Sequence, residues 1–157
     1  MKAESVVTIR KELKHKTPEE LQQLCVRLAR FKAENKELLT YLLFESDSEE
    51  AYINTVKEFI DQQFSDIGSN NYYHIKKSVR KIQRSTKKFI RYSNVKETEV
   101  ELLLYFCKKL KAFRPSISKN TTLQNIYIKQ LEIITKKILK LHEDLQYDYN
   151  EEIEELG

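Results

Sequence analysis

The sequence predicts an all-α protein, an irregular bundle or stack of about six antiparallel helices. The chain has 157 residues but only two glycines and two prolines, too few for the many turns of a β fold. Apolar residues recur at intervals of three and four, the spacing of helices with one buried face. The chain is 40% hydrophobic and 33% charged, which is typical of a folded protein. Long helices around a common core are therefore expected.

A chain of this length suits one domain, which can bury about 70% of its unfolded surface. We expect a single helical domain over residues 1–149 and an acidic C-terminal tail over residues 150–157. Residues 143–157 carry seven acids and no base. The first twenty residues lack the apolar run of a signal peptide, and no stretch has the length of a transmembrane helix. A cytoplasmic protein without membrane insertion is expected.

The N-terminal part predicts two helices. Residues 5–14 carry one apolar stripe, although their β-branched run also favours a strand. Residues 18–33 have a clear start, because Thr17 can cap, Pro18 suits the first position and Glu20 stands at capping-box spacing. The stripe of this second helix is expected to be buried. It consists of Leu21, Leu24, Cys25, Leu28 and Phe31.

Four of the remaining helices are predicted by their apolar residues. Residues 35–45 are apolar nearly all round, which predicts a short helix buried on most sides. Residues 49–66 have one apolar side and one acidic side. Residues 95–113 are the most apolar stretch, with Asn94 and Glu97 at capping-box spacing, and are the candidate central helix. The last helix is expected over 121–148, fraying in the acidic sequence that follows.

Residues 72–92 form the most sharply patterned helix, with eight bases and no acid. On a helix the bases fall in one arc of about 140° and the apolar residues in a separate arc of about 100°. The basic arc, called the basic face below, consists of Lys76, Lys77, Arg80, Lys81, Arg84, Lys87, Lys88 and Arg91.

Four interpretations of the basic face were weighed. The first is a solvated surface, partly neutralised by the helix over 45–66 or by the acidic tail. The others are a contact surface for an acidic protein, a nucleic-acid site and a membrane-facing surface. Cations along one helix side can follow phosphates, and tyrosines beside them can stack on bases. The membrane interpretation is the weakest, because the apolar side is needed for the core. We expect a non-enzymatic protein-interaction or scaffold module, with non-specific nucleic-acid binding as the alternative.

No pattern in the chain predicts catalysis, a cofactor or a metal. Phosphate-binding and dinucleotide-binding loops need several glycines at fixed spacing, and the chain has only two glycines. Cys25 and Cys107 lie on apolar stripes, where buried, free and unreactive thiols are expected. Glu12 and His15 have the spacing of one di-iron half-motif, but no second half-motif exists. They are interpreted as a surface pair.

Several segments resemble a family of small uncharacterised bacterial all-helical proteins. The similarity covers residues 8–113, in the sequences TIRKELKHKTPEEL, NKELLTYLLF, FIDQQF and VELLLYFCKKLKAF. It is a pattern of helix starts and leucine stripes. The resemblance implies an all-helical fold in a bacterial cell, and it brings no activity and no functional residue.

Overall fold

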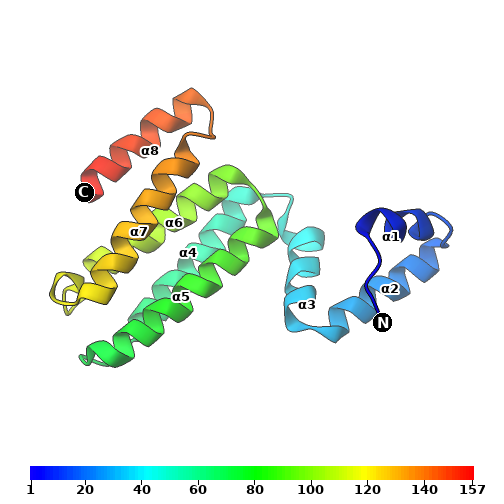
Figure 1. The fold of residues 1–157 in the computed structure, drawn as a ribbon, viewed down its shortest axis with the longest axis horizontal. Coiled ribbons are helices and arrows are strands. Elements are labelled where there is room, and N and C mark those ends of the chain that lie inside the picture. Colours follow the sequence, from blue (N-terminus) through cyan, green and yellow to red (C-terminus); the bar gives the residue numbers. More distant parts are fainter. The chain divides into compact units, whose positions relative to one another are not determined.

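The computed structural model describes all 157 residues and is entirely helical, which confirms the all-α prediction (Figure 1). It contains eight α-helices rather than about six, together with one π-helical and one 3₁₀ turn. The α-helices are α1 (Val6–Leu13), α2 (Pro18–Phe31), α3 (Ala33–Thr40), α4 (Glu49–Ser65), α5 (Tyr72–Ser93), α6 (Lys96–Ala112), α7 (Thr121–Ile138) and α8 (Glu143–Leu156). The π-helical turn is Tyr41–Glu45 and the 3₁₀ turn is Ile117–Lys119. No helix combines the length and apolarity needed to span a bilayer.

The chain divides into two compact units, Met1–Phe44 and Glu45–Gly157. The single domain over residues 1–149 stays a prediction.

The N-terminal unit has almost no buried core, contrary to the sequence expectation. No residue of α1, α2 or α3 is buried, and Tyr41 in the π-helical turn is the buried residue of this unit. α2 and α3 pack against each other, and the Asn35 side-chain amide donates to the Leu28 carbonyl at 2.8 Å. The apolar stripe of α2 nevertheless remains open to solvent. The prediction of its burial is wrong because three short helices supply too little surface to cover it.

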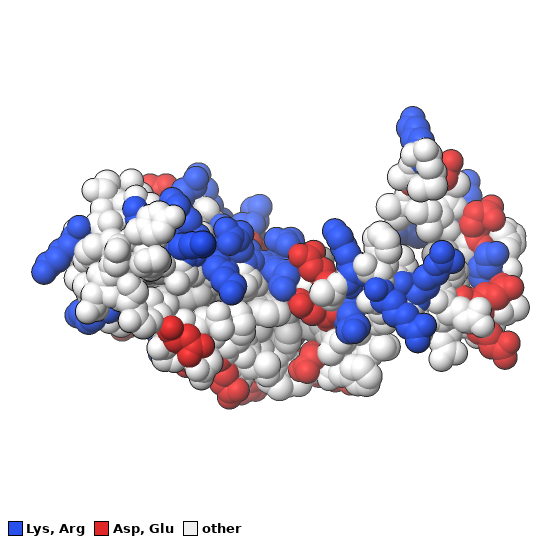
Figure 2. Space-filling model, turned by 90° about the horizontal axis from the view of Figure 1, so that it is seen from below, with Lys and Arg blue, Asp and Glu red and all other residues white.

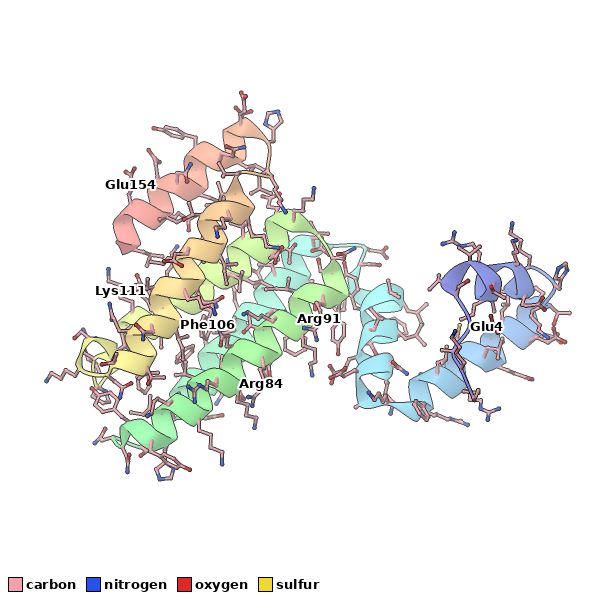
Figure 3. The ribbon with its side chains drawn as sticks, viewed as in Figure 1. Glu4, Arg84, Arg91, Phe106, Lys111 and Glu154 are labelled. Atoms are coloured by element: carbon pink, nitrogen blue, oxygen red, sulfur yellow. The ribbon has the colours of Figure 1, made fainter.

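In the C-terminal unit α6 packs against α4, α5 and α7, and α7 also packs against α8 (Figure 1). The prediction that this segment is the central helix is confirmed. Phe106 lies among the helices of this unit with no exposed surface (Figure 3). The buried residues of α6 are Thr98, Val100, Leu102, Leu103, Leu104, Phe106, Cys107 and Leu110.

Side chains cap most of the helices, and one cap differs from the prediction. The capping box of α2 is confirmed: the Glu20 amide donates to the Thr17 hydroxyl at 3.2 Å and the Thr17 amide to the Glu20 carboxylate at 3.0 Å. Asn94 does not cap α6. It ends α5 instead, with a left-handed φ of 55° that asparagine tolerates better than most residues.

The C-terminal region is also more ordered than predicted. The helix expected over residues 121–148 is two helices, and the segment expected to fray is helical as far as Leu156. Tyr149 and Leu156 are buried, and the Tyr127 hydroxyl donates to the Leu156 carbonyl at 2.9 Å. The many acids obscured this second amphipathic pattern, in which Tyr149, Ile153 and Leu156 recur at threes and fours.

Replacing Gln130 by methionine should stabilise the protein by about 1 kcal/mol, or about 2–4 °C in Tm. Gln130 is 2% exposed, and its side-chain oxygen has no hydrogen-bond partner. Methionine keeps the length of the side chain and removes the unpaired polar atom. Thermal unfolding checks this, with Gln124→Met on the more exposed side of the same helix as the control. A lower Tm for Gln130→Met alone would contradict it.

Candidate basic interaction face

The basic face lies along one continuous helix, α5, opposite the side that enters the core. Ile75 and Val79 are fully buried on that inner side, and Ile82 is 2% exposed. Five cations are exposed, and the other three are partly exposed. Residues 76–91 span about 22 Å along the helix axis at 1.5 Å per residue. Figure 2 shows Lys and Arg side chains gathered along one side of the C-terminal unit. The exposed cations are Lys77, Arg80, Lys81, Arg84 and Arg91.

The cations of the basic face are almost without carboxylate partners. Lys88 interacts with neighbouring groups, and its ammonium lies 5.3 Å from the Phe89 ring centroid. The other seven form no ion pair within the chain. Their mutual repulsion is therefore relieved mainly by solvent and salt.

Two carboxylates of the acidic helix α4, those of Asp61 and Glu49, engage residues of α6 and of the end of α5. Asp61 pairs with Lys109 at 2.7 Å and accepts from the Tyr105 hydroxyl at 2.7 Å. Glu49 accepts from the hydroxyls of Thr98 at 2.6 Å and Ser93 at 2.8 Å. Neutralisation of the basic face by this helix was one of the interpretations of the sequence. The geometry gives these two acids other partners.

The residues around Asp61 favour the ionised form of its carboxyl group. Burial raises the pKa of this carboxyl, but hydrogen bonds from Lys109 and Tyr105 outweigh burial and leave the pKa below its ordinary value. Burial and the Asp61 carboxylate together raise the pKa of Tyr105. Asp61 is thus ionised and engaged near neutral pH, with its charge balanced by Lys109.

The acidic helix α8 is held by α6 and α7. Lys108 pairs with Glu152 at 2.7 Å, and the Tyr149 hydroxyl donates to Glu97 at 3.3 Å. Burial, followed by nearby carboxylates, raises the pKa of Tyr149. Figure 3 shows Glu154 on α8, away from Arg84 and Arg91 on α5. The C-terminal acids make no ion pair with the basic face.

The three tyrosines near the basic face differ in their surroundings. The Tyr72 hydroxyl donates to the Ser116 carbonyl at 2.8 Å, and the Tyr92 ring packs 6.1 Å from the Phe89 ring. Tyr73 is 66% exposed, with its ring 5.3 Å from that of the exposed His74. Among the three, Tyr73 presents the most accessible ring beside the cations.

The other residues considered from the sequence lie outside this face. Glu12 and His15 are both exposed, and no group of three or more potential ligands is arranged to hold a metal ion. Cys107 is buried as predicted, and burial raises the pKa of its thiol to about 12, so it is protonated at neutral pH. Cys25 is exposed, so its predicted burial is wrong. It belongs to the N-terminal unit, whose helices have no buried residue.

No protein-family model, curated protein or solved structure matches the chain. The resemblance to small bacterial helical proteins stays a prediction.

Proposed function

We propose that this protein is a non-enzymatic helical interaction module, or scaffold, whose basic face binds an acidic surface on a partner protein. The observation that carries the proposal is the set of seven exposed or partly exposed cations of the basic face that form no ion pair within the chain. A partner that supplies carboxylates relieves the repulsion among these cations. Such contacts contribute mainly to the rate and specificity of association.

Nucleic acid is the second candidate, and Tyr73 is the observation that favours it. A ring that is 66% exposed at one end of a row of cations can stack on an unpaired base, while the cations contact phosphates. The protein candidate is preferred because the face is confined to one helix, and the other two flanking tyrosines are packed against the protein.

The proposal is tested with a polyglutamate peptide, a DNA duplex of arbitrary sequence and the triple variant Lys77→Glu, Lys81→Glu, Arg84→Glu. At low salt we expect the wild type to bind polyglutamate and the variant to bind it at least about tenfold more weakly. The three reversed cations attract the peptide electrostatically, and their reversal to glutamate makes them repel it. Fluorescence anisotropy measures both affinities. The Tm should change little, because exposed substitutions cost about 0.5 kcal/mol or less each.

The control carries the same change of net charge on another helix. Lys129, Lys136 and Lys140 are exposed on or just after α7 and are reversed to glutamate together. Equal loss of binding in both triple variants would mean that net charge alone matters, and the proposed face would be wrong. Tighter binding of the duplex, with log affinity falling by about 0.9 per phosphate contact against log salt, would favour the second candidate. Failure to bind either probe at low salt would exclude both.

A further inference from the structure

The N-terminal unit exposes an apolar stripe on α2 that its own helices leave uncovered. Leu24 is 39% exposed, Leu28 60% and Phe31 78%. With Leu21 these residues lie within about 80° on the helix surface. α3 packs on one flank of the stripe, near Ala29. A 44-residue unit with so little buried surface is in the size range in which disulfides, a metal or oligomerisation commonly supplement a small core.

The stripe is symmetric along the helix. Leu21 and Leu28 stand three and four residues on either side of Leu24. When two such helices pack antiparallel about a two-fold axis near Leu24, Leu21 of each copy lies opposite Leu28 of the other. The surface is then complementary to itself, as a two-fold interface requires.

The charges beside the stripe have the same symmetry. Glu20 and Arg27 lie about 20° apart on one flank of α2. Glu20 stands four residues before Leu24, and Arg27 stands three residues after it. In an antiparallel pair equivalent flanks meet, so Glu20 of each copy faces Arg27 of the other. Arg27 forms no ion pair within the chain, and one Glu20 oxygen accepts from the Thr17 amide while the other has no hydrogen bond. In a parallel two-fold pair this flank would face the opposite flank of the other copy, where Cys25 and Ala29 lie, so Glu20 and Arg27 would not meet.

We infer that the N-terminal unit is a dimerisation module in which two copies of this chain pair through α2, antiparallel, about a two-fold axis near Leu24. The apolar stripe of each copy covers that of the other, and the Glu20 and Arg27 pairs fix the direction. The inference rests on residues 1–44 and does not depend on the basic face.

Sedimentation velocity of the full chain at about 100 μM tests the association, since a dimer with a micromolar Kd is almost fully formed at that concentration. The wild type should sediment with twice the monomer mass, and Leu28→Glu with the monomer mass. Leu139 is 69% exposed after α7, and Leu139→Glu is the matched control that should remain dimeric. A monomeric wild type, or a dimeric Leu28→Glu variant, would overturn the inference.

Cysteine cross-linking tests the geometry without adding a charge. In a Cys25→Ser background, Leu24→Cys should form an intermolecular disulfide under mild oxidation, because the two substituted positions meet at the axis. Gln22→Cys in the same background is the control, since Gln22 lies about 160° around the helix from Leu24. Cys107 is fully buried and does not contribute. Equal cross-linking at both positions, or none at position 24, would refute the antiparallel pairing through this face.

Discussion

Phe106→Ala is expected to lower the free energy of unfolding by about 3–5 kcal/mol. Phe106 has no exposed surface on the central helix α6, and its ring centroid lies 5.9 Å from that of Phe64 on α4. Alanine removes the buried ring and leaves a cavity that three packed helices cannot readily close. Urea unfolding followed by circular dichroism measures the loss.

The control for Phe106→Ala is Tyr147→Ala, which removes an aromatic ring that is 66% exposed on α8. Its cost should be within about 0.5 kcal/mol, as for most surface changes. A loss below about 1 kcal/mol for Phe106→Ala would contradict the central position of α6 in the core.

Deleting residues 150–157 should destabilise the protein by about 2–4 kcal/mol. The deletion removes Leu156, whose burial contributes about 1.5–3 kcal/mol, and leaves the Tyr127 hydroxyl without its acceptor. It also removes the carbonyl to which the Lys111 ammonium donates, and Glu152, which pairs with Lys108. Thermal and urea unfolding of the shortened chain measure the effect.

Neutralising the tail without shortening it separates charge from packing. Glu151→Gln, Glu154→Gln and Glu155→Gln remove three charges that form no ion pair within the chain. This triple variant should unfold close to the wild type. If the deletion has as little effect as the neutralisation, residues 150–157 are a dispensable acidic tail, as the sequence suggested.

The basic face could be predicted from the sequence because it depends on one helix alone. Eight bases at helical spacing, with isoleucine and valine on the other side, fix their relative directions as soon as the segment is helical. The choice of partners for the α4 acids could not be predicted. Asp61 meets Lys109, and Glu49 meets Thr98, across separations in sequence that only the packing of helices brings together.

For the N-terminal unit, the sequence predicted local structure correctly and burial wrongly. The start of α2 was predicted correctly, since Thr17, Pro18 and Glu20 act on their own backbone. Its burial was not, because an apolar stripe has the same pattern whether it faces the chain's own core or another molecule. Exposed Leu28 and Phe31 are visible only once the neighbouring helices are in place.

By itself, the sequence determined the helical class, the capping box of α2, the segregation of charge on α5 and the central position of α6. These follow from local spacing and from the apolar character of single segments. The tertiary structure decided which acids engage which bases, that the Leu156 carbonyl accepts from the Tyr127 hydroxyl, and that the other helices of the N-terminal unit leave the α2 stripe uncovered. Those properties depend on distances between segments, which helical periodicity does not encode.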